Sequence, residues 1–463
     1  MTRPPKKNPP AAIYRSFRAF VERHGLVGAG DGVLAAVSGG SDSTAMLHLL
    51  ALLRRDVPFD LTVATVDHGL RRETAGEARH VEGVARRLGA RFLLLSGDAR
   101  ARARREKKSL QHAARDLRYE LLAAAAREAG ASRVAVGHTL DDQAETLLMN
   151  LVRGCGLGGL GGMRPLRPPG LIRPVLALRR GELMEFLGSI GEEFRSDPGN
   201  EDRRFMRVRV RKEILPLLEK ENPGIVVRLG ELASEVGESL TFLEGAAGGF
   251  LARAAEKSAG GGWSFPRKLF LAEHAGLRPR IVRRVLLDLA GTLLGFYRPH
   301  FDAVERLARG REGSKSVRLP LGAVARREYD TLIFEKRRAQ VATERGGDGV
   351  IVDGPGVFEP PSLGVRAIVG GEAGDGAFPL ELRGRRRGDR LAGRRKSLKE
   401  FLIDLKVPRG ARDFVPLLVR EGSVVQAGEL FRAEGFSVTC RFEQAGESSP
   451  YFHWLKARRK GVK

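Results

Sequence analysis

Six residues near the start of the chain have the types and spacing to bind phosphate groups. Ser38-Gly39-Gly40-Ser41-Asp42-Ser43 directly follows the apolar run Val33–Val37 and directly precedes a segment with helical apolar spacing. Glycines let a backbone pass close to a ligand, hydroxyls supply donors, and a helix N-terminus offers unpaired N–H groups at the positive end of its dipole. The segment therefore predicts a site for a phosphate or pyrophosphate group.

The alternative for this segment is a flexible Gly/Ser turn in which Asp42 or Ser43 is an ordinary N-cap. Its position at the carboxyl end of a buried strand weighs against that alternative. The chain has no Walker P-loop, which would carry a phosphate-binding lysine. An Asp in place of the lysine suits cleavage between the α and β phosphates, with the glycines on the departing pyrophosphate and Asp42 on Mg²⁺.

The elements that must position this loop alternate short β-rich runs with longer helical patterns, which is typical of βαβ units and a parallel sheet. We expect strands at 32–37, 61–66, 91–95 and 132–137, and helices near 43–54, 74–88, 110–129, 140–153 and 179–190. A turn or helix end at 221–224 marks the first domain boundary. A mostly helical segment follows to about Ala339, with strands at 317–319 and 332–334, then a Gly- and Pro-rich stretch at 345–361 and a small α+β module.

The composition indicates a multidomain protein with an anionic partner. Of 463 residues 42% are hydrophobic, enough for a sizeable core and too many for wholesale disorder, and the length predicts about three domains. The 80 Lys and Arg against 56 Asp and Glu give a net charge of +24. Two basic clusters favour a polyanion, above all nucleic acid, over merely solvated basic faces. They comprise Arg383, Arg385, Arg386, Arg387, Arg390, Arg394, Arg395 and Lys396, and Arg203, Arg204, Arg207, Arg209, Arg211 and Lys212.

The two cysteines, Cys155 and Cys440, are too few for a disulfide framework, a four-cysteine zinc site or a cysteine-held iron–sulfur cluster. We therefore expect a cytoplasmic protein. No apolar run reaches the roughly 20 residues of a membrane helix, and the basic N-terminus is not followed by the apolar core of a secretory signal.

The loop Ser38–Ser43 resembles the PP-loop of the N-type ATP pyrophosphatases, and four further stretches are similar to tRNA(Ile)-lysidine synthetases. These are Val66–Arg71, Leu110–Tyr119, Gly137–Thr146 with Arg153-Gly154, and Asp197–Asn200 leading to Arg207, Arg211, Leu215 and Pro216. Weaker similarity covers Leu319-Pro320 and the stretch from Gly388 to Pro416. The resemblance spans nearly the whole chain, with its specific motifs in the N-terminal part.

This resemblance implies an α/β fold class, with a parallel-sheet PP-loop nucleotide-binding domain (1–222), a mostly helical linking domain (223–345) and a small α+β tRNA-binding domain (346–463). It implies that ATP, with Mg²⁺, adenylates the C2 oxygen of the wobble cytidine of an isoleucine tRNA with a CAU anticodon. The ε-amine of free lysine then displaces AMP to give lysidine, and codon reading switches from AUG to AUA. Whether the chain forms a homodimer is left open.

The expected sheet order and the resemblance place further residues beside the loop. If the first strand lies beside the fourth, Ser38–Ser43 faces Gly137-His138 at the carboxyl ends of these strands. Doubly wound sheets bind their ligands at this place. Asp142, or Asp141, and Glu145 then project to one helix face, where they could bind Mg²⁺ or receive and help deprotonate the lysine ammonium. The alternative is helix capping and surface charge. The candidate catalytic residues are Asp42, Arg115, His138, Asp142 and Glu145.

The remaining candidates are arginines and one histidine. Arg115 and Arg118 share a helical face and could stabilise phosphoryl charge or stack on the target base. Glu106, Asp116 and Glu120 are near enough in sequence to neutralise them instead. Arg118, Arg207 and Arg211 are the candidate substrate-binding residues. The candidate nucleotide ligands are Ser38, Gly39, Gly40, Ser41, Asp42, Ser43 and His68, the last of which could contact adenine or ribose or be a polar turn residue.

Three positions depart from the family pattern, with Gln111 in place of Glu, Gly199 in place of Ser and Val208 in place of Asn. A rival enzyme is a PP-loop tRNA thiolase, but Cys155 and Cys440 are far apart in sequence and do not form the cysteine pair it usually needs. A non-catalytic RNA-binding protein that uses ATP as a conformational ligand would fit the arginine clusters equally well.

Overall fold

The computed structural model describes residues 10–67, 69, 74–195, 202–258, 260–310, 314–336, 349–360, 363–370, 378–445 and 449–460. The chain divides into two compact units, Met1–Phe242 and Leu243–Lys463. This division falls inside the long helix α11 (Ile225–Ala254). The division into three domains at 222 and 345 stays a prediction, and its second boundary lies outside the described residues.

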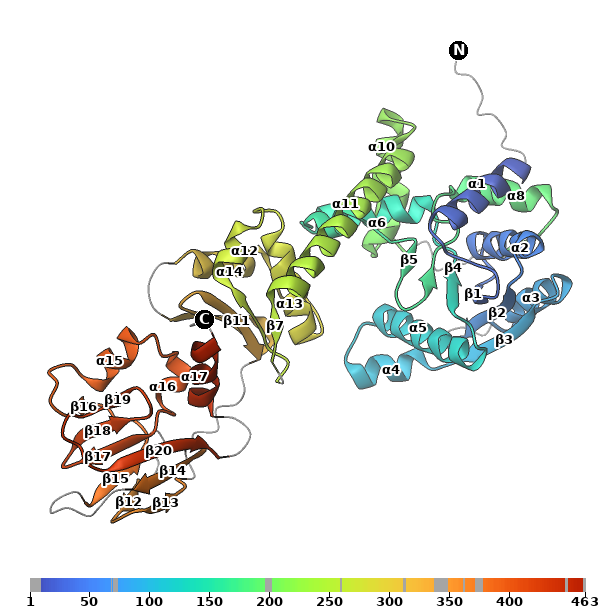
Figure 1. The fold of residues 1–463 in the computed structure, drawn as a ribbon. Helices are drawn as coiled ribbons and strands as arrows, with labels where there is room; N and C mark the ends of the chain where they lie inside the picture. Colours follow the sequence, from blue (N-terminus) through green and yellow to red (C-terminus); the bar gives the residue numbers. More distant parts are fainter. Residues whose placement is uncertain are drawn as a thin grey trace. The chain divides into compact units, whose positions relative to one another are not determined.

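A six-stranded sheet forms the centre of the first unit, in the order β3-β2-β1-β4-β6-β5 (Figure 1). Its strands are β1 (Gly32–Ala36), β2 (Asp60–Asp67), β3 (Arg91–Ser96), β4 (Arg133–Val136), β5 (Leu166–Arg167) and β6 (Leu171–Ile172). All neighbouring pairs are parallel except β5 with β6. The predicted parallel sheet, with the first strand beside the fourth, is confirmed. The β5–β6 hairpin was not predicted, because two-residue strands carry no periodicity.

The helices of the first unit confirm the five predicted ones to within two residues at each end. In chain order they are α1 (Pro10–Arg23), α2 (Ser41–Asp56), α3 (Thr74–Arg87), α4 (Ala99–Glu106), α5 (Leu110–Glu128), α6 (Leu140–Val152), α7 (Leu157–Leu160), α8 (Arg180–Ser189), α9 (Met206–Arg209), the π-helical turn η2 (Val210–Ile214), α10 (Leu215–Glu221) and the start of α11.

Alternate residues of the central strands pack against helices on opposite faces of the sheet. Val33 and Ala35 of β1 belong to a core formed with α1, α2, α3 and α8, whereas Leu34 packs with α5. The two-residue side-chain period of a strand produces this division. Because both faces are covered, β1 reads as a continuous apolar run, and its carboxyl end is held rigidly where the phosphate-binding loop begins.

The first part of the second unit is built on a five-stranded antiparallel sheet, in the order β7-β8-β11-β10-β9. Its elements are β7 (Glu256–Lys257), β8 (Trp263–Pro266), α12 (Arg267–Ala272), α13 (Arg278–Ala290), α14 (Arg298–Arg309), β9 (Lys315–Arg318), the 3-10 turn η3 (Pro320–Gly322), β10 (Ala323–Glu328) and β11 (Thr331–Lys336). Only β9 and β11 were predicted in this mostly helical segment. The inward positions of β10 are Ala323, Ala325 and the buried Arg327, and a buried arginine hides the apolar alternation of a strand.

The C-terminal part is the predicted α+β module, with two sheets of its own. One has the order β12-β15-β17-β18-β16 with β19 on β18, and the other β13-β14-β20. The elements are β12 (Val350–Val352), β13 (Gly356–Phe358), β14 (Val365–Gly370), β15 (Leu380–Arg383), β16 (Arg390–Leu391), α15 (Leu398–Asp404), α16 (Arg409–Arg412), β17 (Leu417–Arg420), β18 (Ser423–Ala427), β19 (Phe431–Arg432), β20 (Thr439–Gln444) and α17 (Pro450–Lys460). Its apolar core shares no residue with the core of 243–336.

Among the helices that the structure describes, none is both long and apolar enough to span a bilayer.

Candidate active site

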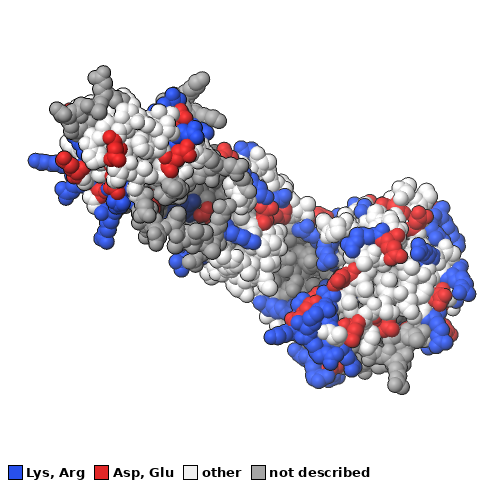
Figure 2. All heavy atoms as spheres, turned by 90° about the horizontal axis from the view of Figure 1, so that it is seen from below, with Lys and Arg blue, Asp and Glu red and all other residues white. Residues whose placement is uncertain are grey.

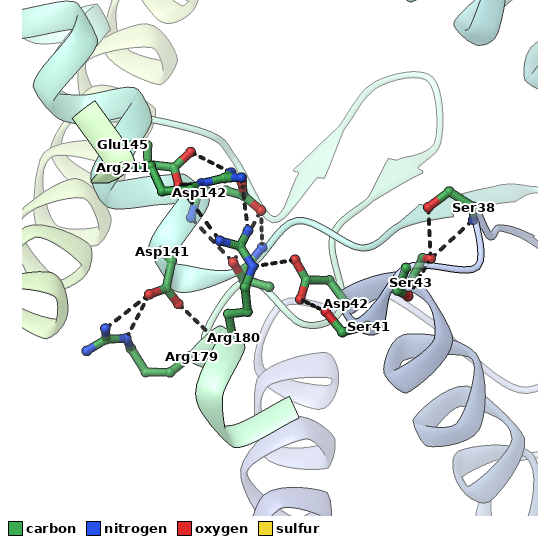
Figure 3. Close-up of polar contacts among 12 residues, drawn as sticks. Ser38, Ser41, Asp42, Ser43, Asp141, Asp142, Glu145, Arg179, Arg180 and Arg211 are labelled. Carbon is green, nitrogen blue, oxygen red and sulfur yellow. Dashed lines mark hydrogen bonds and ion pairs between the residues drawn. The ribbon is translucent and has the colours of Figure 1, made fainter. Parts of the chain in front are cut away.

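Hydroxyl contacts close the loop between β1 and α2. Ser43 Oγ accepts a hydrogen bond from the backbone N–H of Ser38 (3.1 Å), lies 3.2 Å from Ser38 Oγ and donates to the Gly40 carbonyl at 3.1 Å (Figure 3). Gly39 has a φ of 82°, which favours glycine. Since α2 begins at Ser41, the backbone N–H groups of its first turn lie at the carboxyl end of β1, as the phosphate-site prediction requires.

Gly137 lies against this loop, as the strand order predicts, and His138 follows it in the chain. A Cβ on Gly137 would lie 2.9 Å from Cα of Ser43 and 3.0 Å from its N atom. Only a residue without a side chain therefore allows the exit of β4 to pack so closely on the first turn of α2.

Asp142 uses its two carboxylate oxygens differently. Its Oδ2 accepts from the backbone N–H of Thr139 at 3.0 Å, within the capping box that begins α6. Its Oδ1 lies 3.1 Å from Nη2 of Arg207 and 3.5 Å from Nη2 of both Arg180 and Arg211. The capping alternative is thus right for one oxygen. The side chain is buried, at 7% exposure for the residue, so the surface-charge alternative is wrong.

Glu145, one turn further along α6, is fully buried between two arginines. It accepts from Nε of Arg207 at 2.7 Å and from Nε of Arg211 at 2.6 Å. Arg207 lies in α9 and Arg211 in the π-helical turn η2, a kind of irregularity that is frequent at functional sites. The structure therefore brings two candidate substrate-binding residues onto two candidate catalytic carboxylates.

Arg180 links this ion-pair cluster to the phosphate-binding loop. Its Nε donates to Oδ2 of Asp42 at 2.9 Å, and Oδ1 of Asp42 accepts from Ser41 Oγ at 3.0 Å (Figure 3). Because the same guanidinium also faces Asp142, residues from α2, α6 and α8 converge on one point beyond the carboxyl ends of β1 and β4.

The two linked carboxyls titrate in opposite directions. Burial raises the pKa of Asp42, the charge of Asp142 adds to this rise, and Arg180 acts against it. Burial also acts to raise the pKa of Asp142, but Arg207 and Arg180 outweigh it and the pKa is lowered. Asp142 is therefore a fixed negative charge at neutral pH. The ionised form of Asp42 is the costly one, which a further cation would relieve.

Asp42 is the residue that fits a Mg²⁺ ion. In the described ranges no group of three or more His, Cys, Asp or Glu side chains could hold a metal by themselves. Mg²⁺ is commonly bound by one or two carboxylates together with substrate phosphates. Asp42, at the phosphate-binding loop, suits an ion shared with a nucleotide in this way.

His138 is a neutral group in this site. Burial, followed by the nearby charges of Arg173, Arg118 and Arg207, lowers its pKa to about 3, while Asp142 acts in the opposite direction. The imidazole therefore offers a hydrogen bond, and no charge, to a ligand at neutral pH. His68, the other histidine proposed from the sequence, lies outside the described residues.

Arg115 and Arg118 lie on α5, beside the ring of Tyr119. The alternative in which neighbouring acids neutralise them is wrong, because these acids have other partners. Asp116 pairs with Lys108 at 2.8 Å, Glu120 pairs with Arg102, and Glu106 pairs with Arg102 at 2.9 Å and Lys108 at 3.0 Å.

The sequence reasoning missed Arg173, Arg179 and Arg180. Arg179 binds Oδ1 of Asp141 at 3.0 Å, and the backbone N–H of Arg180 donates to Oδ2 of Asp141 at 2.7 Å, so Asp141 caps α8. Two arginines at a helix start are unfavourable beside the positive dipole end unless carboxylates face them. Two adjacent arginines at the start of a predicted helix were therefore the sequence feature from which Arg180 could have been identified as a site residue.

Most residues of the two basic clusters have acidic partners. Arg383 is buried between Asp389 (2.8 Å) and Glu381 (3.0 Å), so it is a core residue of the C-terminal module. Other pairs are Arg204 with Asp202, Arg203 with Glu213, Arg385 with Asp413, Arg386 with Glu381 and Lys396 with Asp404. Lys and Arg are interspersed with Asp and Glu on both units (Figure 2). Less positive charge is therefore free to bind a polyanion than the number of Lys and Arg residues in the two clusters suggests.

The lysine-free glycine loop at the exit of a central parallel strand, with an aspartate at the helix start, defines a PP-loop nucleotide-binding protein. Comparison with known families agrees. Residues 12–218 match the model described as a PP-loop domain, and residues 380–450 match the model described as a TilS substrate C-terminal domain.

Named relatives cover almost the full length. A tRNA(Ile)-lysidine synthase of Geobacter sulfurreducens is 34% identical over 456 residues, or 93% of this chain and 96% of that protein. The one of Geobacillus kaustophilus is 35% identical over 433 residues, or 87% and 91%. The chain belongs to the tRNA(Ile)-lysidine synthase family. Among solved structures, the U34-tRNA thiolase NcsA of Methanococcus maripaludis is 20% identical, covers 49% of this chain and 79% of that one, and has a TM-score of 0.43, too low to support an inference.

Proposed function

We propose that this protein joins lysine to C2 of the wobble cytidine, position 34, of the isoleucine tRNA with a CAU anticodon. ATP is converted to AMP and pyrophosphate, the product is lysidine, and decoding changes from AUG to AUA. The observation that carries the proposal is the link, through Arg180, between the PP-loop carboxylate of Asp42 and the α6 carboxylate of Asp142. We further propose that the reaction takes place in the cytoplasm.

In the first step the C2 oxygen of cytidine bonds to the α-phosphorus, and the bond from that phosphorus to the β-phosphate oxygen breaks. The amides at the start of α2 and the hydroxyls of Ser38, Ser41 and Ser43 bind the departing pyrophosphate. Asp42 would hold the Mg²⁺, which neutralises phosphate charge when bound. Arg180 lies between the loop and α6, where its guanidinium can stabilise the negative charge that develops on the phosphates during this step.

In the second step the lysine ammonium first gives one proton to Asp142 or Glu145. The neutral Nζ then bonds to C2 while the bond from C2 to the AMP oxygen breaks and AMP leaves. Asp142 and Glu145 are the carboxylates proposed to receive the ammonium. In the structure they are neutralised by Arg180, Arg207 and Arg211. We therefore propose an exchange, in which these arginines turn toward phosphates of the bound substrates and the ammonium takes their place. His138, being neutral, donates a hydrogen bond to the base or phosphate.

The test uses the full chain with ATP, Mg²⁺, labelled lysine and an unmodified isoleucine tRNA with a CAU anticodon. The expected result is label in that tRNA and lysidine in the mass spectrum of its wobble nucleoside. The matched control is a methionine tRNA with the same anticodon, which should remain unlabelled. Absence of transfer would remove the proposal. Detection of 2-thiocytidine would identify a thiolase, and tRNA binding without pyrophosphate release would identify a non-catalytic RNA-binding protein.

A further inference from the structure

Three arginines from two separate elements surround one aromatic ring, Tyr119. The guanidinium carbons of Arg115, Arg118 and Arg167 lie 5.5, 5.2 and 5.3 Å from the ring centroid. Arg115 and Arg118 come from α5, whereas Arg167 comes from the end of β5 in the unpredicted hairpin. The ring thus serves as a shared platform, because a guanidinium within about 6 Å of an aromatic face is attracted to it.

Within the described part of the chain, none of these three arginines has a carboxylate partner. The acids nearest in sequence are bound by Lys108 and Arg102, as described above. The positive charge of the arginines also changes the pKa of the Tyr119 hydroxyl. Burial tends to raise the pKa of Tyr119, but Arg118, Arg115 and Arg173 overcome this and lower it. Three like charges held together without counter-charge repel one another, and an anion would remove that cost.

Arg115 and Arg118 lie at the same edge of the sheet as the phosphate-binding loop, and the side chain of Arg167 reaches the Tyr119 ring from the β5–β6 hairpin. Leu117 of α5 contacts Gly97, since a Cβ there would lie 3.0 Å from Leu117 Cδ2. Gly97 immediately follows β3, and its N–H donates to the carbonyl of Asp67 at the end of β2 (3.0 Å). The first turns of α5 are therefore at the carboxyl ends of the strands, where substrates of this fold bind.

We propose that Arg115, Arg118 and Arg167, on the Tyr119 platform, bind a backbone phosphate of the RNA substrate next to the reacting nucleotide. Guanidinium groups match phosphate oxygens bidentately, and contacts of this kind fix the register of a nucleic acid without reading its sequence. The phosphates of ATP are the other source of the same chemistry. The PP-loop already provides for them, so we assign this cluster to the RNA. The inference rests on the proposed function insofar as the substrate is a tRNA.

Arg167 is the residue to test, because it is exposed and none of the proposed reaction steps uses it. The variant Arg167→Gln is expected to weaken tRNA binding about fivefold to tenfold. The salt dependence, log Kd against log salt concentration, should become shallower by about one unit, as for loss of one phosphate contact. KM for ATP should not change. The matched control is Arg127→Gln, an exposed arginine at the opposite end of α5, which should bind tRNA like the unchanged protein.

Equal tRNA affinities and salt slopes for Arg167→Gln and Arg127→Gln would overturn the proposal. A raised KM for ATP with unchanged tRNA affinity would show that the cluster holds nucleotide phosphates, which also overturns it. Tyr119→Leu is a second variant that removes the platform and keeps all three charges, and it too should weaken tRNA binding. Since these measurements use binding without turnover, a protein that binds tRNA as expected but transfers no lysine would refute the proposed function alone.

Discussion

Arg173 donates a hydrogen bond from Nε to Nδ1 of His138 at 3.2 Å, and its Nη1 is anchored on the Arg164 carbonyl at 2.6 Å. A guanidinium has no acceptor, so Nδ1 must accept and the single proton of the neutral imidazole lies on Nε2. Arg173 is therefore a positioning residue, which presents His138 to substrate as a donor. It is itself buried, with 4% exposure.

Arg173→Lys keeps the charge but replaces the two separate donors, to His138 and to the Arg164 carbonyl, by one ammonium on a shorter and flexible side chain. We therefore expect kcat to fall about 10- to 100-fold, as for other groups that orient a functional histidine. The ¹⁵N shifts of His138 should move toward a mixture of tautomers. A control with the same exchange at an exposed site is Arg91→Lys, which should leave kcat and the shifts unchanged. Unaltered shifts with a lowered kcat would contradict the positioning role.

His138 also makes a prediction about pH. Its pKa of about 3 in the folded state lies below the ordinary value of 6.5. Between these values the unfolded chain binds more protons than the folded one, so His138 lowers the stability as the pH falls from about 6.5 toward about 3. His138→Gln should make the loss of stability in acid less steep, measured by urea unfolding at several pH values. Activity should show no break due to His138 between about pH 5 and about pH 9. A steeper acid dependence in the variant would be the opposite result.

We expect the Glu145 side chain to contribute to the stability of the fold as well as to its function. Glu145→Gln leaves Arg207 and Arg211 without their shared buried carboxylate. Loss of one partner of a buried pair costs about 3–5 kcal/mol, and because both arginines are partly exposed we expect about 2–3 kcal/mol in urea unfolding. The control Glu82→Gln removes an exposed pair with Arg86 and should cost less than about 1 kcal/mol. Similar costs for both variants would show that the cluster is loosely held.

Asp42→Asn is expected to separate activity from stability. Pyrophosphate release should fall by at least about 100-fold, because the carboxylate that would hold the phosphate-bound Mg²⁺ is lost. The raised pKa of Asp42 means that its ionised form destabilises the fold above that pKa. The amide variant should therefore melt at an equal or higher temperature at pH 7, with a smaller gain in acid, where Asp42 is protonated. Retained release would show that the metal lies elsewhere, and a lower melting temperature would show that the bond to Arg180 outweighs burial.

Gly137→Ala tests the close packing of β4 on the PP-loop. The new methyl group would meet backbone atoms of Ser43 at 2.9 and 3.0 Å, so the loop must move. We expect KM for ATP to rise about 10-fold and the stability to fall by about 1–3 kcal/mol, as for other overpacked sites. Gly76→Ala in α3, where a methyl group would meet no atom within 4 Å, is the control and should be neutral or slightly stabilising. Equal KM values for ATP in the two variants would mean that the PP-loop can move to accept the methyl group without weakening ATP binding.

The sequence by itself determined the PP-loop, the strand and helix that flank it, and the parallel sheet, because these depend on local spacing and on apolar runs that any βαβ unit needs. It also put Arg207 and Arg211 one helical turn apart. Only the tertiary structure decided what they face, since Glu145 lies about 60 residues earlier in the chain and is reached through folding. The same holds for Arg173, Arg180 and Arg167. A single arginine has no periodicity, and its role is set by which carboxylate, imidazole or ring the fold brings against it.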